Sequence, residues 1–381
     1  MTAGLGREVR REIVGAIATV AVAGLGTGAT VPLVSLKLAA TGVDTAVIGL
    51  MAALPAVGLL LGAPFVGAFA RRIPPRRVLL LAVAGSALVT VPLAGAPALW
   101  AWPALRLISG ACTAALFVLG ETWINQATPD RLRGRMVATY ATAFTGCQLA
   151  GPGLIALLGS EGPAPVAMAV AAHLIGIGLL GRTPGGPVLT GPATGWGFVR
   201  HLRRAPAVVA AVVAFAFFDS AVLALFPLYG MAHGHSEPAA TLMISAILAG
   251  DAALQVPIGW LADRWGRSRV HTGCGVTVVL IAALLPVLIA AQALGWPALV
   301  LLGAAAGSIE TLALVAAGNR YAGQQLLEVN AGLSVVWAVG SLLGPLLGSV
   351  AIDAVGPDGL MIALAAVMAA FVLVNIGTRN P

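Results

Sequence analysis

Apolar residues fill most of the chain, in twelve long runs separated by short polar or turn-forming segments. Glycine and proline mark many of these breaks, as at Gly42, Pro74 and Pro129. Most runs reach about 20 residues, the length that an α-helix needs to cross the hydrocarbon of a bilayer. The pattern predicts an all-α membrane protein with spans at residues 12–36, 44–70, 77–97, 100–126, 134–158, 164–181, 206–229, 238–262, 270–291, 297–318, 325–351 and 358–377.

Composition and charge agree with this prediction and exclude a nucleic-acid partner. The chain is 59% hydrophobic and 9% charged, with a mean hydropathy of +0.97. Its net charge of +7 is spread over many loops and forms no single patch. With the N-terminus in the cytoplasm, 19 of the 21 basic residues fall in cytoplasmic segments, and only Lys37 and Arg106 do not. This follows the positive-inside rule, so we expect both termini in the cytoplasm.

The start of the chain and its cysteines point to no processing site and no metal. The first apolar run follows basic residues without a small-residue cleavage site, so we expect an uncleaved start signal. Cys112, Cys147 and Cys274 lie inside apolar runs, and their spacing fits no metal or redox motif. They are predicted to be small buried residues, and no cofactor is expected.

One charged loop stands out between two apolar runs, Gly259-Trp260-Leu261-Ala262-Asp263-Arg264-Trp265-Gly266-Arg267-Ser268-Arg269. A degraded copy lies 192 residues upstream, Gly67-Ala68-Phe69-Ala70-Arg71-Arg72-Ile73-Pro74-Pro75-Arg76-Arg77. Both copies contain glycine, three further residues, an acid or arginine, and then arginine, followed by a turn and another arginine. The loop resembles the signature loop of the major facilitator superfamily, which follows the second helix of each half of those transporters.

A second repeated feature supports two related halves. Gly151-Pro152 in the fifth predicted span recurs as Gly344-Pro345 in the eleventh, at an offset of 193 residues. The resemblance implies two six-helix bundles, residues 1–181 and 206–381, joined by a cytoplasmic linker at 182–205. The proline and glycine content of the linker opposes a fixed fold, and we expect its arginines to rest on anionic lipid.

The resemblance also assigns a role to the charged loop. In the superfamily, its acid pairs with the eleventh helix or with loop arginines and closes the cytoplasmic side. That latch would comprise Asp263, Arg264 and Arg267, with Gly259 and Gly266 in the motif. A simpler interpretation is a topogenic charge cluster beside a tight turn.

The first copy of the loop departs from the pattern. It keeps Gly67 and Arg72, but Arg71 replaces the acid and Pro74 stands where the turn glycine is expected. An arginine cannot hold the positively polarised N-terminus of a helix, so we expect gating to differ between the halves.

Small residues recur in the eleventh span as Gly340-x-x-x-Gly344-Pro345-x-x-Gly348. The stretch resembles the antiporter motif that drug-efflux members carry in the fifth helix, although here the better match lies in the other half. Close helix packing at a proline bend is the simpler interpretation, and we prefer it.

Three acids are predicted near mid-membrane, all in the second half: Asp219, Asp251 and Glu310. Asp251 precedes Asp263 by twelve residues, which places it about 18 Å from the cytoplasmic rim. An ionisable side chain in hydrocarbon costs at least about 2.5–3.5 kcal/mol, so each acid needs a reason. We expect these acids to include a proton-coupling site. The alternative is that hydroxyl or backbone groups satisfy each carboxylate.

Further polar residues are candidates for a substrate cavity: Arg106, Gln148, Gln255, Asn330 and Trp337. An arginine in the fourth span suits a substrate carboxylate or phosphate, but its depth also permits snorkelling to the outer interface.

The segment from Glu121 to Asn125 resembles uncharacterised bacterial permeases of the superfamily. The simplest role for Glu121 is pairing with Arg131, Arg133 or Arg135 across the next loop.

A possible metal site lies in the predicted outer loop after the seventh span. Met231, His233 and His235 occur there, and methionine with histidine suits copper. No spaced methionine pair accompanies them, so an ordinary polar loop is the preferred interpretation.

Together these features predict a secondary transporter in a bacterial cytoplasmic membrane. No catalytic motif is present, so no enzyme is expected. We expect a monomer that moves a small organic solute, amphipathic or hydrophobic, by alternating access with proton coupling. Its partners are therefore the solute, protons and membrane lipid. Two alternatives are a copper or other soft-metal importer and a non-transporting membrane sensor or scaffold.

Overall fold

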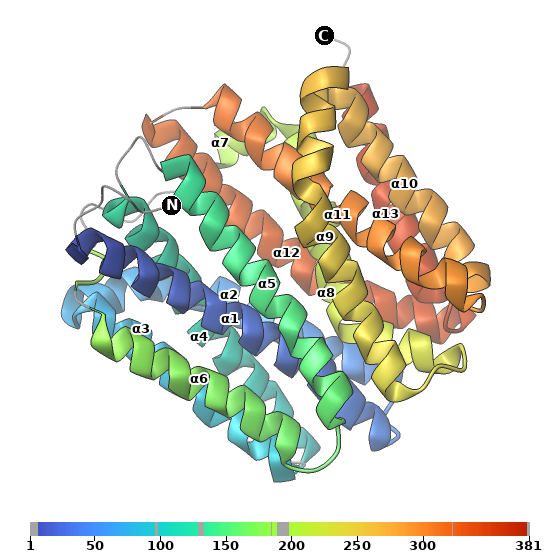
Figure 1. Cartoon of the computed structure of the whole chain (residues 1–381), viewed down its shortest axis with the longest axis horizontal. Helices are drawn as coiled ribbons and strands as arrows, with labels where there is room; N and C mark the ends of the chain where they lie inside the picture. Colours follow the sequence, from blue (N-terminus) through green and yellow to red (C-terminus); the bar gives the residue numbers. More distant parts are fainter. Residues whose placement is uncertain are drawn as a thin grey trace. The chain divides into compact units, whose positions relative to one another are not determined.

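The computed structural model describes residues 7–95, 98–128, 133–183, 185–188, 198–321 and 323–378. Throughout these ranges the regular structure is helical (Figure 1). The elements are α1 Arg7–Ala40, α2 Thr45–Arg72, α3 Pro75–Thr90, η1 Val91–Gly95, η2 Leu99–Ala101, α4 Trp102–Ala127, α5 Arg133–Leu158, α6 Ala164–Arg182, α7 Phe198–Arg203, α8 Pro206–Ala232, α9 Glu237–Trp265, α10 Arg267–Leu288, α11 Gln292–Arg320, α12 Gly323–Val355 and α13 Gly359–Gly377.

Twelve stretches of helix are long and apolar enough to cross a membrane, and each overlaps one predicted span. The third stretch joins α3 to η1, and the six-residue α7 is not among the twelve. Helices suit a membrane because each backbone N–H and C=O is satisfied within the segment. The predicted all-α membrane protein with twelve spans is confirmed.

Two compact units make up the chain. The first comprises Met1–Lys37 and Leu54–Ala193, and the second holds the rest, including Leu38–Ala53, which runs from the end of α1 through a turn into α2. Within the second unit, Asp353 of α12 accepts a hydrogen bond of 3.1 Å from the backbone N–H of Ala46, at the start of α2. The sequence-based division into two bundles and a linker stays a prediction.

The core of the first unit lies around α4. Leu119 and Trp123 of this helix are buried together with Leu79 and Val83 of α3 and Leu180 of α6. Each of these side chains is at most 1% exposed, so they form an apolar centre of the kind that fixes helix positions by close packing.

In the second unit, α8 is the most enclosed helix among the twelve candidate spans. It packs against α9, α11, α12 and α13, and its large side chains Phe217, Phe226 and Tyr229 are almost fully buried. A polar residue on α8 is therefore surrounded by protein and faces little lipid.

The internal repeat is visible in how equivalent helices cross. In the first unit Gly58 of α2 packs against the carbonyl of Leu107 on α4, and in the second Gly250 of α9 packs against that of Val300 on α11. The two glycines are 192 residues apart, which is the offset of the charged loops, and the two carbonyls are 193 apart. Small residues allow such close backbone approach.

The glycine series of α12 also serves packing. Gly340, Gly344 and Gly348 all lie against α8, and a Cβ added at Gly344 would overlap the carbonyl of Phe217. This geometry agrees with the preferred interpretation of the series as a helix-packing surface.

The linker is more structured than its composition predicts. It contains α7, and Tyr321 donates a hydrogen bond of 3.2 Å from its hydroxyl to the carbonyl of His201 on that helix. Nearer α6, the amide of Gln126 donates to the carbonyl of Val188 at 2.6 Å and accepts from its N–H at 2.9 Å. The expectation of no fixed fold is therefore wrong for these parts, because groups outside the linker satisfy its backbone.

Candidate functional site

The three predicted mid-membrane acids come from three different helices of the second unit. Asp219 lies on α8, Asp251 on α9 and Glu310 on α11. Asp219 and Asp251 are buried, with 7% and 6% exposure, and Glu310 is partly buried. The negative charges of both aspartates act on Glu310, so the acids form one electrostatic cluster although 91 residues separate the outermost pair.

Close packing of α9 against α11 fixes the position of Asp251. Its carboxylate lies directly on Gly307, where any side chain would overlap it. One turn further along α9, the amide of Gln255 donates a hydrogen bond of 2.6 Å to Oδ1 of Asp251. Gln255, which the sequence suggested as a cavity residue, is thus a direct hydrogen-bond partner of Asp251.

Two hydroxyl groups next to or near the acids in sequence donate hydrogen bonds to backbone carbonyls. Ser220, next to Asp219, donates to the carbonyl of Ala216 at 2.8 Å, and Ser308 donates to that of Ala304 at 2.7 Å. Back-bonding of this kind satisfies the serine within its own helix. These two hydroxyls are therefore bonded to backbone carbonyls of their own helices.

A buried histidine lies beside this cluster and was missed by the sequence analysis. His271 of α10 shares a hydrogen bond of 2.9 Å, through Nε2, with the carbonyl of Ile309, the residue before Glu310. Its ring also contacts Phe371 of α13, with centroids 4.9 Å apart. A histidine inside an apolar run was the available signal, but nothing local connects it to α11.

This arrangement suits proton binding better than a fixed charge. Three ionised carboxylates within one apolar unit would repel one another and lose hydration, so full ionisation is costly. Among the described residues, no three His, Cys, Asp or Glu side chains are placed to hold a metal ion. The three acids are thus electrostatic neighbours contributed by α8, α9 and α11.

The remaining cavity candidates are two residues of the first unit and two residues of α12. Arg106 and Gln148 are buried in the first unit, at 3% and 4% exposure. The burial of Arg106 places it among protein groups, so its side chain does not extend to the surface by snorkelling. On α12, Asn330 is exposed and Trp337 is partly buried.

The intact signature loop forms the turn between α9 and α10. Gly266 has φ +90°, a conformation that favours glycine. Arg267 donates to Asp263 at 3.3 Å, and the guanidinium of Arg264 lies over the ring of Trp260, 4.1 Å from its centroid. The acid thus pairs with a loop arginine in an exposed position, where an ion pair contributes about 0–1 kcal/mol.

The degraded copy forms a different turn. Its Pro74 has φ −47°, and α3 starts directly after it. Arg71 and Arg72 are exposed, whereas Arg76 donates to the carbonyls of Leu180 and Gly181 at 3.0 and 2.7 Å. A basic residue of this copy therefore caps the end of α6, a role that the motif did not predict.

The histidines of the candidate metal loop have separate partners. His233 shares its Nδ1 with the carbonyl of Tyr229 at 2.9 Å and places Nε2 3.0 Å from Asp358. His235 meets the carbonyl of Ile289 at 3.1 Å. Both rings are thus engaged with protein groups, and neither needs Met231 as a neighbour.

Glu121 lies on α4 with an accessible side chain, and its charge acts on the phenol of Tyr140 on α5. Its predicted partner Arg131 lies outside the described residues, as do the side chains of Arg133 and Arg135.

Comparison with known proteins agrees with the fold and the repeat. A family model described as Major Facilitator Superfamily matches residues 16–250 and 209–380. Among curated relatives, the uncharacterised MFS-type transporter YcaD of Salmonella dublin is 28% identical over 362 residues, covering 92% of each chain. A second, the uncharacterised MFS-type transporter YfkF of Bacillus subtilis, is 25% identical over 338 residues, covering 86% of this chain and 85% of its own.

Solved structures share the fold across nearly the whole chain. The nucleoside transporter NupG superposes with a TM-score of 0.77 at 13% identity, covering 99% of this chain and 100% of its own. The D-xylose–proton symporter superposes with a TM-score of 0.74 at 16% identity, covering 97% of each chain. The twelve spans, the repeated signature loop and the match of the family model lead to one conclusion: this chain belongs to the major facilitator superfamily and is a secondary transporter.

Proposed function

We propose that this transporter is proton-coupled and moves a small organic solute across a bacterial cytoplasmic membrane. The observation that carries the proposal is the gathering of Asp219, Asp251 and Glu310 from α8, α9 and α11 inside one unit. A sensor or scaffold with this fold would gain nothing from three acids within its membrane-spanning helices, because each costs free energy in hydrocarbon. Binding and release of protons would explain why acids are present there despite this cost.

The internal repeat supports placing the proton site in the second half. At the offsets that relate the crossing helices, the first unit has Leu59 where the second has Asp251, and Phe117 where it has Glu310. Both apolar residues pack against the core of the first unit. Acids at these positions therefore occur in the second half alone, whereas the equivalent positions of the first half hold apolar side chains.

The proposed solute is amphipathic or hydrophobic, because the spans offer few polar side chains apart from the acids. The D-xylose–proton symporter is, by its name, proton-coupled, so this fold is compatible with such coupling. Copper import receives no support from the loop histidines, because each has a protein partner.

A two-stage experiment tests the proposal. A thermal-shift screen of the purified protein against organic metabolites, drugs and metal ions first identifies a ligand. Uptake of that ligand is then measured in proteoliposomes with and without an imposed pH gradient. We expect gradient-dependent uptake in the wild type and its loss in at least one of Asp219→Asn, Asp251→Asn and Glu310→Gln.

Glu161→Gln is the matched control, because Glu161 lies in an exposed turn between α5 and α6. Uptake that ignores the pH gradient, or that survives in all three amide variants, would show that these acids do not couple transport to protons. Binding without any transport would favour a sensor or scaffold.

A further inference from the structure

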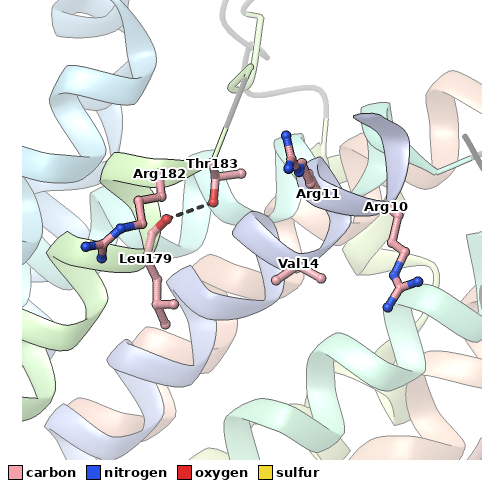
Figure 2. Close-up of a pocket in the computed structure, with 6 residues that line it drawn as sticks. All are labelled: Arg10, Arg11, Val14, Leu179, Arg182 and Thr183. Carbon is pink, nitrogen blue, oxygen red and sulfur yellow. Dashed lines mark hydrogen bonds between the residues drawn. The ribbon is translucent and has the colours of Figure 1, made fainter. Parts of the chain in front are cut away.

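A pocket of about 540 Å³ lies in the first unit, between the end of α6 and the start of α1 (Figure 2). The charge distribution assigns this end of both helices to the cytoplasmic side. The pocket is lined by Arg10, Arg11, Val14, Leu179, Arg182 and Thr183. None of these residues belongs to the proposed proton site.

Close packing between α1 and α6 fixes the walls of the pocket. Val22 of α1 packs on Gly176 of α6, and nearer the pocket Gly15 packs on Thr183. The hydroxyl of Thr183 donates to the carbonyl of Leu179 at 2.8 Å, as Figure 2 shows. The walls are therefore regular helix surface, and the space between them is part of the folded unit.

The rim of the pocket is strongly basic. Arg10, Arg11 and Arg182 are all exposed, and within the part of the chain that the structure describes none of them forms an ion pair. The acid nearest in sequence, Glu12, lies against Gly185 of the linker. Three arginines thus place positive charge at this end of α1 and α6.

The floor of the pocket is apolar and open. Val14 and Leu179 are 52% and 46% exposed, and they lie one turn or less from the arginines, toward the hydrocarbon. Further along α6, Leu174 and Ile175 continue the exposed apolar surface. The site therefore has a cationic end at the interface and an apolar end in the bilayer.

We propose that this pocket binds the headgroup of an anionic phospholipid of the cytoplasmic leaflet, with an acyl chain along Val14 and Leu179. Arginine is suited to phosphate, since its planar guanidinium donates two parallel hydrogen bonds. Basic pockets between membrane helices on the cytoplasmic side favour such headgroups. The three guanidiniums point in different directions in Figure 2 and meet at no common point, so the site does not suit a small enclosed anion.

Native mass spectrometry of the full chain tests this proposal. The protein is equilibrated with equal amounts of phosphatidylglycerol and phosphatidylcholine carrying the same acyl chains, and the retained lipids are counted. We expect a preference for phosphatidylglycerol of about tenfold or more, since three basic residues contribute. Arg10→Gln, Arg11→Gln and Arg182→Gln combined should abolish it.

Two controls separate the pocket from general positive charge. The combined variant Arg71→Gln, Arg72→Gln, Arg77→Gln removes three exposed arginines of the same unit that do not line the pocket, and it should keep the preference. Val14→Trp places a bulky ring on the apolar side of the pocket while leaving every charge in place, and it should weaken the preference. This variant also covers the case in which the triple pocket variant does not fold.

Three results would overturn the proposal: equal lipid retention in the wild type, equal losses in the two triple variants, or an unchanged preference in Val14→Trp. In a last experiment, inorganic phosphate is added as a competitor of phosphatidylglycerol. If it displaces phosphatidylglycerol at comparable concentration, the pocket is a site for free phosphate, and the lipid proposal fails.

Discussion

The side-chain amide of Gln255 donates a hydrogen bond of 2.6 Å to Oδ1 of Asp251, one turn earlier on the same helix. Since Asp251 is 6% exposed, this donor is a substantial part of what stabilises its carboxylate. A hydrogen bond to a charged group contributes about 1.5–3 kcal/mol, so the loss of Gln255 should matter for any step in which Asp251 carries charge.

Gln255→Met removes the donor and keeps the approximate size of the side chain. We predict a fall of about tenfold in the initial rate of ligand-driven proton uptake, with the fold retained. The rate is measured in proteoliposomes, and monodispersity in gel filtration checks the fold. An unchanged rate would mean that Gln255 does not support a working carboxylate.

Gly307 offers a test of the position of Asp251. In Gly307→Ala the new methyl group would overlap the carboxylate, which must move, whereas Gly318 on the same helix has open space around it. We predict that Gly307→Ala impairs proton-coupled uptake severely and that Gly318→Ala does not. Equal activity of the two variants would contradict the close contact between α9 and α11.

The glycine series of α12 should act through stability. A methyl group at Gly344 would meet the backbone of Phe217, which cannot swing away as a side chain can. We predict that Gly344→Ala lowers the free energy of unfolding by about 1–3 kcal/mol, and that Gly273→Ala, which has open space, does not. Thermal unfolding in detergent measures both. Loss of transport in Gly344→Ala at full stability would favour an antiporter motif instead.

The two glycines of the intact signature loop should differ. Gly266 has φ +90°, so Gly266→Ala should cost about 1 kcal/mol or more of stability through backbone strain. Gly259 has open space and no such conformation, so Gly259→Ala should leave the melting temperature unchanged. If Gly259→Ala nevertheless slows transport, that glycine acts in a conformation other than the one described.

The loop histidines should not bind copper. We predict that the double variant His233→Ala, His235→Ala binds as much copper as the wild type, measured by equilibrium dialysis. The reason is that both rings already have protein partners in Tyr229, Asp358 and Ile289. A clear loss of bound copper in the variant would reopen the metal-import alternative.

Much of the fold was predictable because lipid imposes it. A run of about 20 apolar residues has few stable choices other than a spanning helix, so the spans followed directly from hydropathy. The repeat also had a sequence signature, in loops that share a turn and a row of charges. The same signature did not reveal that Arg76 caps α6, because that contact crosses 104 residues.

The sequence was enough to predict which acids belong to the candidate proton site, but not how their side chains are arranged. The depth of Asp219, Asp251 and Glu310 could be counted from the span ends, but the rotation of each helix about its axis could not. Whether three acids face one another depends on how α8, α9 and α11 pack, and small residues such as Gly307 decide that. For the same reason His271 could not be linked to α11 from its local sequence.

Proton coupling through the three acids is tested most directly by measuring proton flux in pyranine-loaded proteoliposomes. The flux is recorded when a ligand from the thermal-shift screen is added outside. We predict acidification of the lumen in the wild type or, for an exporter, its reverse. That signal should disappear in at least one of Asp219→Asn, Asp251→Asn and Glu310→Gln and persist in Glu161→Gln. A proton flux that is undiminished in all three amide variants would show that these acids do not couple transport to protons.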